Sequence, residues 1–271
     1  MTRGLRLADP ANGADHDLPA PTGPVRTYVL ASSPRTGSTL LARWIAATGR
    51  AGDPKEYLNP MQIRDWEARL APTFLGRWAH RALVGPLVNL AGHGRWTDAR
   101  LRQHLDRVRA RRSCAGWFGL KLHAHHRERW FDEAGRDAVA WLDAARWILV
   151  ERDDELAQAV SWARARRSGR WVAHQPSHLP DVYDRAAIHG RLTAVRAARE
   201  SWARFFDAHA VEPLRIGYEA LVADPAATVG AALRFLDVSD SVALGPPPLA
   251  RQADATSAAW IARYRAEAGV P

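Results

Sequence analysis

Apolar residues along this chain fall into two repeating patterns. Four short, mostly apolar runs have the aromatic and branched side chains of strands buried on both faces of a sheet. These runs span residues 28–30, 117–122, 146–150 and 214–216. Elsewhere apolar residues recur every three or four positions, which predicts helices. The helices are expected at residues 38–48, 153–167, 184–209 and 226–235. Strands that alternate with helices predict an α/β fold with a central parallel sheet.

Composition divides the chain into a lead-in, one domain and an insertion. Residues 1–24 are rich in Ala, Pro, Gly and Asp, and are predicted to be disordered. Residues 25–271 are predicted to form a single domain, because 47% hydrophobic content over 271 residues suffices for one large core. Residues 61–112, between the first two strands, have helical spacing and are predicted to be a helical insertion. Its aromatic residues suit a core, a substrate lid or a dimer face.

The first strand and first helix are joined by a polar loop with one glycine, Gly37. Strand, glycine-containing loop and helix form the layout that binds phosphate, because loop N–H groups and the positive helix N-terminus converge. The Walker pattern requires a Lys between the glycine and the Ser or Thr, whereas Ser38 follows Gly37 directly here. Arg35 supplies a cation instead. The pattern therefore predicts an anion-binding loop without the charge clamp of a kinase.

Charge and cysteine content narrow the classes of partner. The chain has 38 basic and 29 acidic residues, a net charge of +9, which favours nucleic acid, an acidic membrane or an anionic cofactor. Its single cysteine, Cys114, excludes an internal disulfide and a cysteine-based zinc site. There is no run of 18 apolar residues and no convincing signal peptide. A cytoplasmic protein with no transmembrane segment is expected.

Two segments together resemble a known family. Residues 33–41, SPRTGSTLL, resemble the 5′-phosphosulfate loop of sulfotransferases, and residues 51–57, AGDPKEY, make the chain most similar to the bacterial trehalose 2-sulfotransferase family. The resemblance implies a P-loop-like three-layer α/β sandwich. It also implies sulfuryl transfer from 3′-phosphoadenosine 5′-phosphosulfate (PAPS), without a metal, to a small sugar or glycoconjugate acceptor. It suggests a homodimer and no nucleic-acid partner.

The resemblance assigns the donor to three places in the chain. The 5′-phosphate is expected on Arg35, Thr36, Gly37, Ser38 and Thr39. Arg152 follows the third strand at its carboxyl end and Ser161 lies on the next helix, a pattern that resembles the family's 3′-phosphate site. Carboxyl ends of strands are where open α/β sheets bind ligands. A late segment that begins at Arg251 resembles the region that folds over the cofactor. Taken alone, Arg152 could equally form a local ion pair, and Arg251 could be a surface residue.

Proton removal from the acceptor has two candidate bases. Glu56 resembles the general base of the trehalose sulfotransferase family, and an exposed loop glutamate is the alternative. His123 follows Lys121 in a Lys-x-His pattern that resembles animal and plant sulfotransferases, in which the histidine is the base. We rank Glu56 first and assign Lys121 to the bridging oxygen. With His125 and His126 beside it, His123 could also belong to a surface cluster.

Acceptor-binding residues follow from the same resemblance. Asp53 and Tyr57 flank Glu56, and Trp171 lies in a Ser-Gly-Arg-Trp run similar to the family's Thr-Gly-x-Trp. These three residues, with Glu56, are predicted to contact the acceptor. The sequence identifies neither the acceptor nor its attacked hydroxyl. Two other classes stay open: a nucleotide-dependent phosphotransferase, which would need magnesium, and a basic nucleic-acid-binding protein, whose affinity would collapse with salt.

Overall fold

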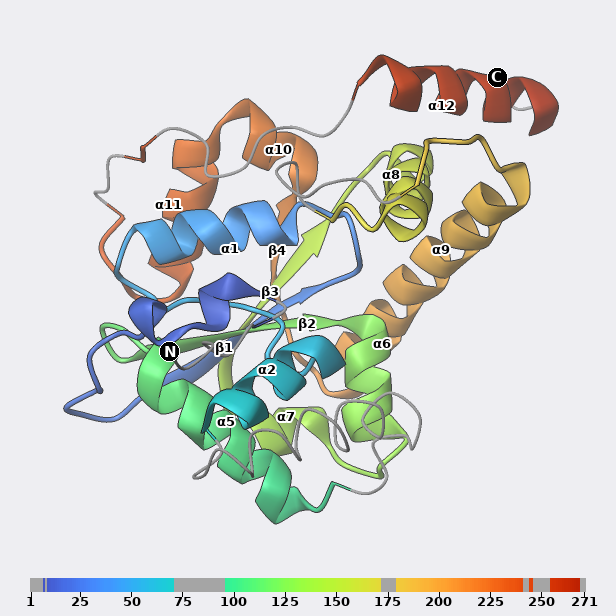
Figure 1. The fold of residues 1–271 in the computed structure, drawn as a ribbon. Coiled ribbons are helices and arrows are strands. Elements are labelled where there is room, and N and C mark those ends of the chain that lie inside the picture. Colours follow the sequence, from blue (N-terminus) through green and yellow to red (C-terminus); the bar gives the residue numbers. More distant parts are fainter. Residues whose placement is uncertain are drawn as a thin grey trace, which may run out of the picture.

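A four-stranded sheet lies at the centre of the computed structural model, which describes residues 7, 9–70, 96–171, 179–240, 244–245 and 254–268. Its strands are β1 (Arg26–Ser32), β2 (Trp117–His123), β3 (Ala144–Glu151) and β4 (Leu214–Gly217). They are parallel and ordered β2-β1-β3-β4 (Figure 1). The α/β class and all four predicted strands are thus confirmed.

Helices cover both faces of the sheet because successive strand residues point to opposite sides. Tyr28 and Leu30 pack with helices α1 (Ser38–Ala47) and α11 (Pro225–Phe235). Val29 and Ala31 face the other layer. That layer contains α2 (Pro60–Leu70), α5 (Asp98–Arg112), α7 (Ala138–Leu142) and the end of α9 (Arg185–Ala208). Figure 1 shows these two layers above and below the strands, which confirms the three-layer sandwich.

Aspartate side chains set the starts of three predicted helices. Asp154 accepts a hydrogen bond from Ala157 N–H at the start of α8 (Glu155–Ser168). Asp184 and Asp224 do the same at the starts of α9 and α11. Each cap satisfies a backbone donor that has no partner within its helix. The helices therefore begin one residue after these aspartates, close to the predicted positions.

Helix-like sequence is expected after Arg127, and the chain forms a π-helical turn, η5 (Glu128–Asp132), there. Other helices were not predicted from periodicity, such as the short α6 (Ala124–Arg127) directly after β2. The segment after β4 is helix α10 (Tyr218–Ala223), and the C-terminal part is α12 (Ala255–Ala268). Helix α12 packs through Trp260 and Tyr264 on Val160 and Ile188 of α8 and α9. Short helices have too few turns for a clear periodic signal, and α12 buries only a narrow stripe.

The N-terminal segment differs from its prediction. Residues 9–17 are not a disordered lead-in, because they contain two 3₁₀ turns, η1 (Pro10–Asn12) and η2 (Ala14–His16). Asp9 N–H donates to Asp65 of α2, and Arg69 forms an ion pair with Asp17. Asn12 is fully buried. The order comes from polar contacts with distant residues, which a local composition of Ala, Pro, Gly and Asp does not report.

The predicted insertion, residues 61–112, is helical where it is described. Helices α2 and α5 lie at its two ends, and residues 71–95 are outside the described ranges. Trp66, Leu101 and Val108 are fully buried in the core beneath β1 and β2. For these residues the core interpretation holds. No helix in the described ranges is both long and apolar enough to cross a bilayer.

Candidate active site

The candidate site lies at the carboxyl ends of neighbouring strands, where the loops that follow these strands run to opposite sides. From the central strand β1 the chain passes to β2 on one side, and β3 lies on the other side. Loops that follow neighbouring strands then diverge and leave a crevice at the carboxyl ends, the usual place of ligands in open α/β sheets. The loop after β1, residues 33–37, and the end of β3 at Arg152 both lie there.

The loop after β1 presents unpaired backbone donors. Arg35 and Gly37 have left-handed backbone conformations, with φ of 70° and 82°. Thr36 closes the turn by donating from its hydroxyl to Ser33 O at 3.1 Å. Among the residues that the structure describes, the backbone N–H groups of residues 36–39 have no acceptor, whereas Leu40 and Leu41 N–H both donate to Gly37 O. Four free donors at a helix N-terminus form an anion site.

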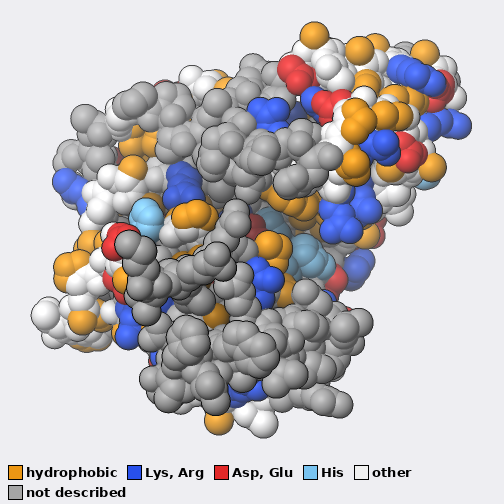
Figure 2. All heavy atoms as spheres, in the orientation of Figure 1, with side chains coloured by type: hydrophobic (Ala, Val, Ile, Leu, Met, Phe, Trp, Pro, Cys, Tyr) orange, Lys and Arg blue, Asp and Glu red, His pale blue; other side chains and the backbone are white. Residues whose placement is uncertain are grey.

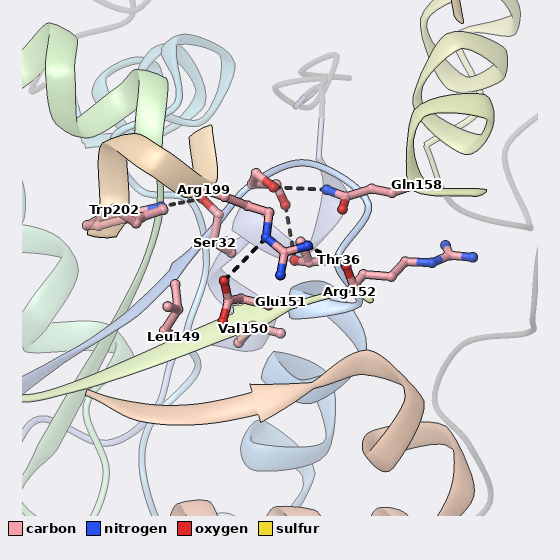
Figure 3. A pocket seen from close by; sticks show the side chains of 10 residues that line it. Ser32, Thr36, Leu149, Val150, Glu151, Arg152, Gln158, Arg199 and Trp202 are labelled. Atoms are coloured by element: carbon pink, nitrogen blue, oxygen red, sulfur yellow. Dashed lines mark hydrogen bonds and ion pairs between the residues drawn. The ribbon is translucent and has the colours of Figure 1, made fainter. Parts of the chain in front are cut away.

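Two side chains that sequence reasoning missed flank this loop and the end of β1 from opposite sides (Figure 3). The amide of Gln158, which is 1% exposed, donates to Ser33 Oγ at 2.9 Å and to Pro34 O at 2.8 Å. Trp202 Nε1 of α9 donates to Ser32 O at 2.9 Å. Gln158 lies one helical turn before Ser161 on α8, so the shared helix face was a signal that could have found it. Trp202 had no such local signal.

Two cationic side chains converge beside the loop. Arg35 donates from Nε to Ser161 Oγ at 2.9 Å and from a terminal nitrogen to Trp171 O at 2.6 Å. The Arg152 guanidinium lies 4.7 Å from the centre of the Tyr218 ring, and its buried Nε has no partner among the described residues. Burial and the nearby charge of Arg152 lower the pKa of Arg35 to about 10, so it stays cationic at neutral pH. Two neighbouring guanidinium groups suit a multiply charged anion.

Glu56 lies between two basic side chains. Its Oε1 is 2.8 Å from Lys121 Nζ and 3.2 Å from His123 Nε2, and its Oε2 accepts from Asn59 at 2.9 Å. Burial alone would raise the pKa of this carboxyl, but Lys121 and His123 hold the pKa well below its ordinary value. Glu56 is therefore ionised at neutral pH, the state that a proton acceptor requires.

The same two basic residues join Glu56 to the loop. Lys121 Nζ donates to Thr39 Oγ1 at 2.6 Å, at the start of α1. His123 Nδ1 lies 2.9 Å from Ser32 Oγ, so both ring nitrogens of His123 have partners. The structure thus brings together both candidate bases, the lysine and the anion-binding helix start.

The histidines after β2 are only partly a surface cluster. His123 and His126 are 6% and 5% exposed, whereas His125 is exposed, and its ring centre is 4.1 Å from that of His126. Burial lowers the pKa of His126 well below the usual histidine range. Figure 2 shows histidine at the surface near α6 with Lys and Arg side chains around it. In the described ranges no cluster of three or more His, Cys, Asp or Glu side chains could hold a metal ion.

The other predicted site residues have partners or positions of their own. Tyr57 is fully buried, stacks on Phe118 and donates to Asp53 O at 2.5 Å, so it cannot touch an acceptor in this structure. Asp53 faces the buried Arg112 at 3.5 Å.

Trp171 contributes its carbonyl to Arg35, and its side chain is exposed. Ser38 is buried in the first turn of α1. Arg251 lies outside the described residues.

Fold and site together define a group-transfer protein with an anion-binding loop, and comparison with known proteins gives its class. Residues 27–267 match the model of the Stf0 sulphotransferase family. The chain belongs to this family and is a sulfotransferase. The match gives no support to the phosphotransferase and nucleic-acid-binding alternatives.

Several individual proteins are similar to the chain. Trehalose 2-sulfotransferase of Mycolicibacterium smegmatis is 30% identical over 267 residues, with 89% of this chain and 95% of the relative covered. Trehalose 2-sulfotransferase of Mycobacterium tuberculosis is 28% identical, with 90% and 96% covered. Among solved structures, a sulfotransferase from Alicyclobacillus acidocaldarius has 18% identity and a TM-score of 0.47, with 91% and 96% covered.

Proposed function

We propose that the protein transfers a sulfuryl group from PAPS to a hydroxyl of a carbohydrate, trehalose-like, or of another glycosylated or hydroxylated small molecule. The observation that carries this proposal is the position of Glu56. Its carboxylate lies between Lys121 and His123, and Lys121 reaches Thr39 at the anion-binding helix start. In-line transfer to a hydroxyl requires a base, a cation and an anion site close together, and these contacts join all three.

The donor-binding residues fit a nucleotide with two phosphate positions. The free N–H groups of residues 36–39 would bind the 5′-phosphosulfate, and Arg152 with Ser161 would bind the 3′-phosphate. Arg35, bonded to Ser161, lies between the two. The unpartnered Nε of Arg152 is an observation in favour, because a buried guanidinium nitrogen needs an acceptor. PAPS supplies the activated sulfuryl group.

The acceptor side requires removal of one proton. The acceptor hydroxyl would lose it to the Glu56 carboxylate as the new bond from its oxygen to sulfur forms. The bond from sulfur to the bridging oxygen of PAPS would break in the same step, and 3′-phosphoadenosine 5′-phosphate would leave. His123 keeps Glu56 in place through its Nε2, while Ser32 orients the other ring nitrogen. Lys121 provides positive charge next to Thr39, where the bridging oxygen would carry growing negative charge. Glu56 is the base and His123 a positioning residue in this proposal.

A sugar acceptor is supported by the relatives named trehalose 2-sulfotransferase, at 30% and 28% identity. Incubation with PAPS and a panel of disaccharides, followed by mass spectrometry for a sulfated product, tests the acceptor.

The homodimer and the cytoplasmic location stay predictions from sequence. Light scattering of the purified chain tests the first.

The donor site is tested by calorimetric titration with 3′-phosphoadenosine 5′-phosphate (PAP), AMP and ATP-magnesium. We expect micromolar binding of PAP and much weaker binding of AMP. Arg152→Ala should weaken PAP binding at least tenfold, because hydrogen bonds to charged groups contribute about 1.5–3 kcal/mol each. Arg166→Ala is the matched control, since Arg166 is an exposed arginine of α8, the helix that carries Ser161. Equal affinity for PAP and AMP would contradict the proposal.

A further inference from the structure

A buried polar network lies beside the loop that carries Glu56. The reaction proposed above gives this network no role. Lys55, next to Glu56 in the chain, is 9% exposed. Its Nζ lies 2.7 Å from Asp9 Oδ2 and 3.1 Å from Asn12 Oδ1. Gln62 of α2 donates to the same Asp9 oxygen at 3.1 Å. A buried ammonium group is tolerated only with partners that replace its lost water. Lys55 therefore depends on the N-terminal segment to hold its position.

The backbone transmits this anchoring to Glu56. Lys55 forms an isolated parallel bridge with Leu120, and its carbonyl accepts from Lys121 N–H and from Tyr57 N–H, both at 2.9 Å. Successive side chains of extended backbone point to opposite sides. Accordingly, the Lys55 side chain reaches Asp9 while the Glu56 side chain reaches Lys121. Lys121 is thus bound through its backbone to Lys55 and through its ammonium group to Glu56.

A second contact fixes the other end of the same loop. Arg112 is fully buried, and one of its guanidinium nitrogens donates to Ala11 O and Gly13 O at 3.1 Å. The other terminal nitrogen lies 3.5 Å from Asp53 Oδ2. Asp53 N–H also donates to Arg112 O at 3.0 Å. The loop that carries Glu56 is therefore tied to residues 9–13 both at its start and at Lys55.

We propose that residues 9–13 form a strap that positions Glu56, with Asp9 as a positioning residue that acts through Lys55. This inference rests on the proposed function, in which Glu56 accepts the acceptor proton. The strap contacts the loop that bears the base. The donor residues Arg35 and Ser161 are held by a hydrogen bond of their own. Loss of the strap should therefore impair the acceptor side and spare the donor side.

The test compares Asp9→Ala and Asp9→Glu with Asp15→Ala in the full-length chain. Asp15 is an exposed carboxylate of the same segment and serves as the matched control. Amide hydrogen exchange is measured at Tyr57 and Lys121, whose N–H groups both donate to Lys55 O. We expect Asp9→Ala to accelerate exchange at both amides at least tenfold, Asp9→Glu to restore most protection, and Asp15→Ala to match the wild type.

Two further measurements separate positioning from general destabilisation. PAP affinity of Asp9→Ala should stay within twofold of the wild type, and kcat with the identified acceptor should fall at least tenfold at unchanged donor KM. Equal exchange in Asp9→Ala and Asp15→Ala would overturn the inference. So would accelerated exchange throughout β1 and α8 together with lost PAP affinity. If the wild type fails to bind PAP, the proposed function fails, while the exchange result still reports whether the strap holds the loop.

Discussion

Glu56 has an environment that pulls its pKa in opposite directions. Burial favours the protonated acid, whereas Lys121 at 2.8 Å and His123 at 3.2 Å favour the carboxylate and prevail. A base with a low pKa is always ready to accept but holds a proton weakly. In the proposed reaction, the developing charge near Thr39 competes with Glu56 for the Lys121 ammonium group, which would make the carboxylate more basic when the proton leaves.

The two candidate bases are distinguished by substitution. Glu56→Gln keeps the size of the side chain but removes the proton acceptor, so kcat should fall about 10²–10⁴-fold. PAP affinity should stay within twofold. His123→Ala should lower kcat less, about tenfold, because it removes only the orienting contact to Glu56. Steady-state kinetics with the acceptor found by screening measures both. A larger loss in His123→Ala than in Glu56→Gln would make histidine the base.

Removal of the lysine should change the titration of Glu56. A carboxyl with a depressed pKa in the folded state stabilises the protein above its unfolded pKa of about 4.3, and this contribution is lost as pH falls through the lower folded value. Lys121→Met removes the strongest opposing charge while burial stays, so the pKa of Glu56 should rise. Carboxyl ¹³C titration, assigned by comparison with Glu56→Gln, measures it. Lys121→Arg is the control, and an unchanged pKa in Lys121→Met would contradict this account.

At the scale of elements, the sequence predicted the parts whose signals are local. The strand-loop-helix unit, the strand-end Arg152 and the spacing to Ser161 all lie in short segments. Gln158 and Trp202 were missed because their contacts with the loop join residues 125 and 170 positions apart. Periodicity reports which face of a helix is buried but not what it is buried against.

The order of residues 9–17, which polar contacts hold in place, was not predicted for a related reason. Residues 9–17 lack the apolar pattern that predicts an ordered element, and their order depends on α2, α5 and Lys55. Tyr57 also differs from its prediction. The motif that carries Glu56 suggested a place at the acceptor, but Tyr57 lies in a turn and its ring enters the core.

Two glycines that flank α1, one before it and one after it, form a matched pair. Both Gly37 and Gly49 have left-handed φ, 82° and 64°. A Cβ at Gly37 would lie 2.5 Å from the Tyr218 ring, whereas nothing lies within 4 Å of one at Gly49. Gly49→Ala should therefore cost only the backbone strain, about 1–2 kcal/mol of unfolding free energy.

Gly37→Ala should cost more stability and also weaken PAP binding at least tenfold. The Tyr218 ring would have to move, and the Arg152 guanidinium lies over it at 4.7 Å. Urea denaturation and calorimetric titration of both variants separate strain from displacement. Equal effects of the two substitutions on PAP affinity would contradict the structural account.

At the scale of the whole molecule, much of the positive charge is structural. Arg112, Arg164 and Arg199 each form ion pairs that join distant segments, at Asp53, Asp254 and Glu155. Arg164 also pairs with Asp181, and so links α8 to the segments that precede α9 and α12. A net charge of +9 therefore does not indicate a nucleic-acid surface by itself. The guanidinium groups of Arg35 and Arg152, beside the anion-binding loop, bear on ligand binding instead.

The central place of β1 also affects how the chain is made. β1 is synthesised first, yet its neighbours in the sheet are β2 and β3, and Trp202 closes its end from 170 residues further on. At about 5–20 residues per second, translation needs roughly 10–30 s to span that interval. β2 and β3 are made during it, but the end of β1, whose central residues Tyr28 to Ala31 are apolar, stays open until Trp202 follows. The nascent chain should consequently be a chaperone client until α9 is complete, and early arrest should yield aggregates rather than a partial enzyme.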